Sequence, residues 1–173
     1  GLRPHNLLGS APNSMGLTRY KVQTAATAGS SSSIFQGDMV IPLTNGLVDV
    51  SAADGGSVAI LGVMNGCEYI DLNGKPRFDN HYPGTSSIKS GTEASIFVYD
   101  NPHQIFEVQG DASLTNAATA QALVHSNAEG AGFGSENGAT GKSIGELAVS
   151  TAGATTAGDN FRIVGIKDDF DQY

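Results

Sequence analysis

Apolar residues recur along this chain in short runs, and glycine, proline or asparagine separates most of them. Val58–Met64 is a continuous apolar run that is too short for a helix and is typical of a strand buried on both faces. Gln104–Gln109 alternates, which places Phe106 and Val108 on one face of a strand. Other runs predict strands at Tyr20–Thr24, Ile34–Leu43, Leu47–Val50, Tyr69–Leu72, Ala94–Tyr99, Ser143–Ser150 and Phe161–Ile166. Short, closely spaced strands predict an all-β fold, either a compact β-barrel or a β-sandwich.

Turn signals stand between these strands. Asn73-Gly74 predicts a type I′ hairpin turn, because both central residues of that turn need positive φ. Asn45-Gly46 is a second hairpin signal, and Gly37-Asp38 predicts a turn or bulge inside its apolar run. Pro83-Gly84 marks a further connection.

The chain contains one segment that favours a helix. Ala117–Leu123 is rich in alanine, and Ser113 or Thr115 could cap its beginning. We therefore expect one short helix in an otherwise β-rich fold. Gly130–Gly141 is dense in glycine, and we expect a mobile loop there.

Residues 1–16 follow neither a period of 2 nor a period of 3.6, and Pro4 and Pro12 oppose a regular element. We predict that residues 1–16 form an extended N-terminal arm and that residues 17–173 form a single β-rich domain; a solvated terminus is the alternative for the arm. Apolar side chains in an arm would suit a groove on a partner, and nearby basic side chains would suit its acidic groups. The expected contact residues are Leu2, Arg3, Leu7, Leu8, Met15, Arg19 and Lys21.

The charge balance limits the possible partners. Seventeen acidic residues and nine scattered basic residues give a formal net charge of −8 over 173 residues. Such a surface repels a phosphate backbone, so we expect no nucleic-acid partner. No apolar run approaches the ~18 residues that a membrane-spanning helix requires, so we expect no membrane partner. The single cysteine, Cys67, excludes an internal disulfide and a cysteine metal cluster, and we expect a small buried side chain there.

Two short motifs carry weak chemical signals. Gly141-Lys142-Ser143 resembles the end of a phosphate-binding loop, but Glu136 stands where that motif needs another glycine. Asp71-Leu72-Asn73-Gly74 is similar to the start of a calcium loop, but its glycine is at the fourth position instead of the sixth. We interpret the second motif as a hairpin turn.

No residue pattern indicates catalysis. The four histidines have no pair at metal-ligand spacing, and no Gly-x-Ser-x-Gly nucleophile motif is present. We expect no catalytic residue, no metal and no cofactor, and therefore a protein that is not an enzyme. Glycan binding remains an alternative, because Tyr82, Tyr99 and Phe133 could form a small aromatic platform, although Tyr82 and Tyr99 more readily fill the interior.

Several segments are similar, in amino-acid sequence and in their order along the chain, to one group of viral proteins. These segments are Ile34–Val40, Glu68–Pro76, His81–Thr85, Asn101–Gln109 and Thr140–Leu147. Together they resemble the capsid decoration (cement) proteins of tailed bacteriophages.

The resemblance implies a viral structural protein that binds the outer surface of a phage head and stabilises contacts between major capsid proteins. It also implies a location on the virion surface and a homo-oligomer, with a trimer preferred. Two alternatives stay open: a protein associated with the phage tail or fibre, and a glycan-binding β-sandwich module.

Overall fold

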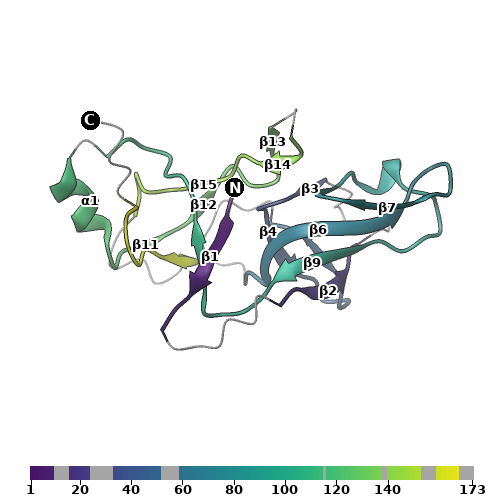
Figure 1. Cartoon of the computed structure of the whole chain (residues 1–173), viewed down its shortest axis with the longest axis horizontal. Helices are drawn as coiled ribbons and strands as arrows, with labels where there is room; N and C mark the ends of the chain where they lie inside the picture. The colour runs from purple at the N-terminus through teal and green to yellow at the C-terminus, as the bar shows by residue number, and fades with distance from the viewer. Residues whose placement is uncertain are drawn as a thin grey trace.

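The computed structural model describes residues 1–9, 16–23, 33–51, 59–114, 116–137, 140–152 and 159–167. Over these residues the chain is built mainly from β-strands, with a single short α-helix, α1 (Figure 1). One sheet has six strands, and five further sheets have two strands each. The predicted all-β class is confirmed. The described sheets do not close into a barrel, so the fold is open and sandwich-like.

The six-stranded sheet is organised around its longest strand, β6. Its order is β2-β9-β6-β4-β5, and β7 also pairs with β6. Strand β6 is long enough to pair with β9 along one edge and, on the other, with β4 at its beginning and β7 at its end. The strands are β2 (Thr18–Lys21), β4 (Met39–Pro42), β5 (Val48–Val50), β6 (Gly62–Ile70), β7 (Pro76–Asp79) and β9 (Ser95–Tyr99).

Both predicted Asn-Gly hairpins are present, but the turn type differs from the prediction. Gly74 has a φ of 78°, whereas Asn73 is not among the residues with positive φ. The Gly74 N–H donates to Asp71 O (2.9 Å), and the Asp71 N–H donates to Lys75 O (2.9 Å). This is a three-residue loop that ends in a glycine bulge, so only the glycine needs the left-handed conformation. The turn between β4 and β5 has the same form, with a φ of 78° at Gly46.

Two hydrophobic clusters lie on opposite faces of the six-stranded sheet. Val40 and Met64 belong to the larger cluster, and their sequence neighbours Met39 and Val63 belong to the smaller one. Neighbouring residues of a strand point to opposite faces, so the sheet carries buried side chains on both sides. The remaining members of the larger cluster are Val22, Ile34, Val48, Val50, Cys67, Tyr82, Ile88, Ala94, Ile96 and Val98. Leu2 and Phe133 complete the smaller cluster.

The first residues of the chain are part of the folded body, contrary to our expectation that they lack a regular element. Strand β1 (Arg3–Leu7) pairs antiparallel with β10 (Gln104–Glu107). Pro4 is tolerated because β1 pairs with one strand only, and a proline on the free edge loses no ladder hydrogen bond. Leu2 is only 3% exposed, and its N–H donates to Gly37 O (3.0 Å).

The later half of the chain consists of short paired strands and α1. Helix α1 (Ala117–Leu123) has the predicted bounds, but Asn116 caps it by accepting from the Thr119 N–H (2.9 Å). Ser113 does not take that role, and Thr115 lies outside the described residues. The remaining elements are β3 (Ile34–Phe35), β8 (His81–Tyr82), the 3-10 turn η2 (Thr85–Ser87), β11 (Asn127–Ala128), β12 (Gly130–Ala131), β13 (Glu136–Asn137), β14 (Lys142–Ser143), β15 (Glu146–Leu147) and β16 (Phe161–Arg162). The predicted loop 130–141 thus contains two strands, and the predicted strands after it are shorter than expected.

A buried carboxylate joins the two halves. Asp38 has no exposed surface, and its two oxygens accept from the Phe35 N–H (2.8 Å) and from the Gly134 N–H (3.0 Å). Phe35 ends β3, whereas Gly134 follows β12 and lies 96 residues from Asp38 in sequence. Desolvation raises the pKa of the Asp38 carboxyl, and hydrogen bonds from Ser143, Phe35 and Gly134 oppose that rise.

Replacing Asp38 by asparagine should weaken the fold in a pH-dependent way. One of the two N–H donors would then face an amide NH2, which we expect to cost about 1–2 kcal/mol at pH 4. The pKa of Asp38 is higher in the folded state than in the unfolded state. The contribution of the Asp38 carboxyl to the free energy of unfolding is therefore fully present below the unfolded pKa of 3.8, and it is lost as the pH rises through the folded pKa. Urea unfolding at pH 4 and pH 7 should therefore show a smaller difference between wild type and Asp38→Asn at pH 7. A difference that grows with pH would contradict this assignment.

Candidate partner-binding surfaces

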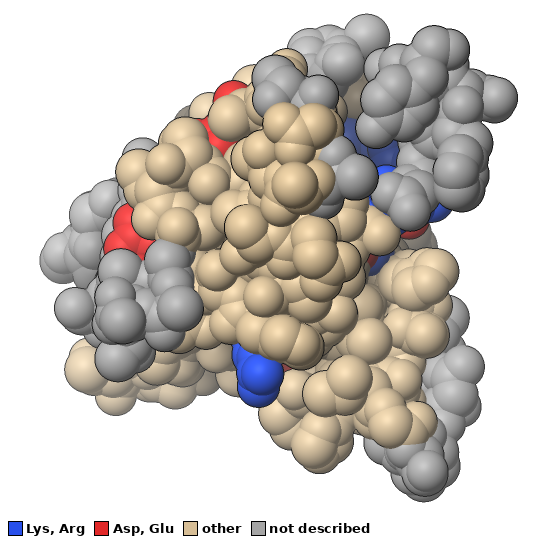
Figure 2. Space-filling view, turned by 90° about the vertical axis from the view of Figure 1, so that its left-hand side faces the viewer, with Lys and Arg blue, Asp and Glu red and all other residues tan. Residues whose placement is uncertain are grey.

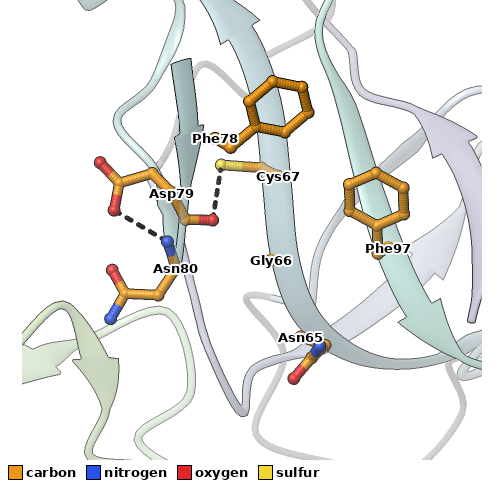
Figure 3. A pocket seen from close by; sticks show the side chains of 7 residues that line it. All are labelled: Asn65, Gly66, Cys67, Phe78, Asp79, Asn80 and Phe97. Carbon is orange, nitrogen blue, oxygen red and sulfur yellow. Dashed lines mark hydrogen bonds between the residues drawn. The ribbon is translucent and has the colours of Figure 1, made fainter.

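Part of one face of the six-stranded sheet is left uncovered by the described residues. The covered part holds Met39 and Val63, on which Leu2 and Phe133 pack. Farther along β6 the same face carries a shallow hollow over Gly66, which Figure 3 shows between two phenylalanine rings and beside the β7 strand.

The hollow follows from the strand register. The pairing of β6 with β9 shifts between Met64 and Gly66, so Asn65 is an extra residue and Gly66 comes to lie opposite Phe97. Because Gly66 has no side chain, the floor between the rings of Phe97 and Phe78 stays open. Phe78, on β7, is 77% exposed. An apolar ring this exposed marks a candidate contact surface.

Polar side chains at the rim of the hollow make hydrogen bonds within the chain. In Figure 3 the side chains of Asp79 and Asn80 extend to the side opposite Phe97. Asp79 accepts from the Asn80 N–H (2.8 Å), and the Asn80 amide donates to Thr140 O (2.8 Å). These groups are engaged in the fold, which leaves the two rings and the backbone to form the hollow.

Basic residues that we expected to meet a partner make ion pairs within the chain. Arg19 pairs with Glu68 on the uncovered sheet face, and Lys21 pairs with Glu93 (2.7 Å). Arg3 lies opposite Glu107 in the β1–β10 register. These exposed pairs contribute little to stability, so they could still be exchanged for pairs with another protein.

The apolar residues expected in an arm fall into different environments. Leu2 is buried in the smaller core cluster and is not available to a partner, which corrects its predicted role. Leu7 is half-buried in β1, whereas Leu8, directly after β1, is 53% exposed. Met15 lies outside the described residues. Leu8 and the exposed Leu17 are therefore the available apolar side chains in this part of the described chain.

The end of the molecule that carries α1 offers a third surface. Residues 112–128 contain no Asp, Glu, Lys or Arg. Leu114, shortly before α1 in the sequence, and Val164, shortly after β16, are exposed apolar residues. Figure 2 views this end, and charged side chains take up little of its described surface. Depletion of charge is typical of the centre of protein–protein interfaces.

The aromatic platform considered for glycans does not form. Tyr82 has no exposed surface and lies in the larger core cluster, as expected of a residue that fills the interior. Phe133 is buried in the smaller cluster, and Tyr99 is only partly exposed on β9. Burial raises the pKa of the Tyr82 hydroxyl to about 12. The accessible aromatic pair is instead the exposed Phe78 and the partly exposed Phe97, which the sequence did not single out.

The two weak chemical motifs have structural roles. Lys142 and Ser143 form β14, which pairs with β13 instead of beginning a helix, so no phosphate-binding loop is formed. Asp71 accepts from the N–H groups of Asn73 and Lys75 (2.9 Å each) and pairs with Arg77 (2.9 Å). These bonds, led by the one from Lys75, hold the pKa of the Asp71 carboxyl below its usual value. The motif is a hairpin turn, as interpreted.

Cys67 is buried on β6, as the sequence predicted. Its thiol donates to His81 O (3.0 Å) and more weakly to Asp79 O (3.5 Å). Desolvation, followed by the charge of Asp79, raises the pKa of the Cys67 thiol to about 12.

Cys67 should therefore be unreactive in the native protein. The thiolate is the reactive form, and at pH 8 a pKa of about 12 leaves roughly one thiol in 10⁴ ionised. We expect a chromogenic disulfide reagent to label Cys67 in 8 M urea and to leave the native protein unlabelled over the same time. Equal labelling rates in the two conditions would contradict the buried assignment.

The described residues contain no group of three or more His, Cys, Asp or Glu side chains that could hold a metal ion. Among these same residues, no helix has the length and apolar character needed to cross a bilayer. Comparison of the chain with protein-family profiles, with curated proteins and with solved structures found no match. The described part of the chain thus presents exposed apolar side chains and an end surface with little charge.

Proposed function

We propose that this chain is a capsid decoration protein, which binds the outer surface of a tailed-phage head and stabilises contacts between major capsid proteins. One observation carries the proposal: the candidate contact surfaces lie at opposite ends of the molecule. The β6–β7 hairpin, with exposed Leu72 and Phe78, is at one end of the long axis, and α1 is at the other (Figure 1). The order of sequence segments that resemble decoration proteins supports the same function.

Contact surfaces at two ends suit a protein that bridges neighbouring subunits. Each contact can be weak, because linked contacts raise the overall affinity by about 10²–10⁴-fold over one contact. Association into a trimer or another homo-oligomer would multiply these contacts further. A specific interface buries at least about 1,000 Å² in total, and an uncharged end surface is suited to such burial.

The charge of the chain fits this location. A net charge of −8 suits a protein on the outside of a shell, where it meets coat protein instead of the packaged DNA. In this proposal the protein acts by binding alone, without catalysis, cofactor or membrane.

Direct imaging would test the proposal. Cryo-electron microscopy of purified virions should show the protein on the outer head surface, in contact with more than one coat subunit. Density on the tail or on a fibre would favour the tail alternative, and absence from the particle would overturn the proposal. In a second measurement, purified protein should raise the temperature at which capsids that lack it release DNA.

Glycan binding is a second candidate, favoured by the hollow between Phe78 and Phe97. Aromatic faces can stack on the apolar face of a sugar ring, and Phe78 is accessible enough to do so. This candidate predicts saturable binding of the isolated protein on a glycan array and its loss in Phe78→Ala. Leu72→Ala, which removes an exposed side chain from the same hairpin outside the hollow, is the matched control.

A further inference from the structure

His125 adopts a backbone conformation that side chains other than glycine rarely take. Its φ is 75°, and it is the one residue in the described ranges other than glycine with a positive φ. Nine described glycines occupy the other positive-φ positions. Glycine would adopt this conformation at lower energetic cost, so a histidine here requires a reason that lies in its side chain.

The backbone around His125 is fixed by strand pairing. The His125 N–H donates to Ile163 O (2.8 Å), and Asn127 pairs with Arg162 where β11 meets β16. These contacts hold His125 and Arg162 side by side, and both side chains are exposed. The imidazole is therefore presented to the outside from a rigid position and does not fill the core.

The two side chains form a set of hydrogen-bond donors. Arg162 Nη2 lies 3.5 Å from His125 Nδ1. A guanidinium group can only donate, so Nδ1 can take part in this contact only as the acceptor, which requires the tautomer with its N–H at Nε2. The remaining guanidinium N–H groups and the Nε2–H of His125 are left as donors, and the group that matches such a set is a carboxylate.

No carboxylate of the described chain fills that place. Four other basic residues pair with acidic side chains, whereas Arg162 has no such partner among the residues described. On the face of the α1 end that Figure 2 views, uncharged residues make up most of the described surface. A charged donor set within an uncharged surface fits an interface that receives a single acidic side chain.

We propose that His125 and Arg162 form the charged centre of a contact at the α1 end, which receives an Asp or Glu side chain of the coat protein. The inference rests on the proposed capsid function, because it takes the coat protein as the partner. Val164, two residues after Arg162, is an exposed apolar side chain next to this contact in the chain.

The experiment measures binding of the purified full chain to capsids that lack it. We expect Arg162→Gln and His125→Gly each to weaken binding about tenfold, and Arg162→Glu to weaken it further by repulsion. Lys89→Gln is the matched control, because Lys89 is exposed and belongs to none of the ion pairs found in the described chain. His125→Gly relieves the backbone strain, so its urea midpoint should equal or exceed that of the wild type, and a loss of binding then cannot be assigned to unfolding.

The outcomes separate the two proposals. If the wild type binds capsids and the Arg162 and His125 variants bind equally well, the contact is wrong and the capsid function stands. If Lys89→Gln weakens binding as much as Arg162→Gln, net charge explains the effect and the contact is also wrong. A change in oligomeric state with unchanged capsid binding, measured by light scattering, would assign the surface to a second copy and overturn the inference. If the wild type does not bind capsids, both the proposed capsid function and the proposed contact with the coat protein are wrong.

Discussion

Replacing Leu2 by alanine should lower the free energy of unfolding by about 3 kcal/mol, since truncating a buried leucine leaves a cavity as well as losing apolar contact. Leu2 is 3% exposed and packs with Met39, Val63 and Phe133. If Leu2 belonged to a detached arm, the same substitution would leave the free energy of unfolding of the isolated protein unchanged.

Leu8→Ala is the matched control for this prediction. Leu8 is 53% exposed and lies only six residues farther along the chain. Its substitution should therefore change the free energy of unfolding by less than about 0.5 kcal/mol. The chain has no tryptophan, and urea unfolding is best followed by far-UV circular dichroism. Equal stability of Leu2→Ala and Leu8→Ala would mean that the first residues are not anchored in the core.

Gly62→Ala should be the most damaging glycine substitution in β6, at about 3 kcal/mol. A Cβ atom at Gly62 would lie 2.3 Å from the backbone oxygen of Tyr99 and 2.7 Å from Val98 Cγ1. Because the backbone oxygen belongs to a residue paired with β6 and cannot move cheaply, the beginning of β6 and the end of β9 would have to separate.

Gly66→Ala, in the same strand, provides the comparison. Its Cβ atom would lie 3.2 Å from Asp79 O, a tight contact that a small shift at the sheet edge can relieve. We expect a loss of less than about 1 kcal/mol at Gly66. Urea unfolding of both variants would test the ranking, and a Gly66 variant less stable than the Gly62 variant would contradict it.

Local signals in the sequence predicted the parts of the fold that form locally. The Asn-Gly hairpins were found because a glycine that needs positive φ follows directly on an apolar run. Helix α1 was placed correctly because its alanines have high helix propensity and its neighbours do not. The type I′ turn predicted for Asn73-Gly74 was wrong, since the Asp71 side chain and the glycine bulge favour a longer loop.

Strand β1 was missed because its partner is distant in sequence. Arg3 pairs with Glu107, and nothing in the local pattern around Pro4 indicates that pairing. The two-residue strands from β11 to β16 were predicted poorly for a related reason. An alternating pattern requires at least four residues, whereas pairs such as Gly130 with Leu147 are fixed by tertiary contacts.

The uncovered sheet face was also missed, although part of its signal is visible. Phe97 stands between Ile96 and Val98, so β9 is apolar on both faces, and a strand of that kind is normally covered on both sides. Among the described residues, the covering elements extend over only part of this face, and the sequence does not show where they end. Phe78 lies between Arg77 and Asp79, a pattern that favours an inward ring, yet the ring points outward.

The smaller core cluster brings Leu2 together with Phe133, which is synthesised much later. During translation the pocket for Leu2 therefore stays incomplete until Phe133 has left the ribosome. Contacts between such distant residues slow folding, because closing the long loop between them costs entropy before the contact contributes any stability. The newly made chain should thus pass through a stage in which its first strand is still undocked, and at that stage an identical neighbour could capture the strand.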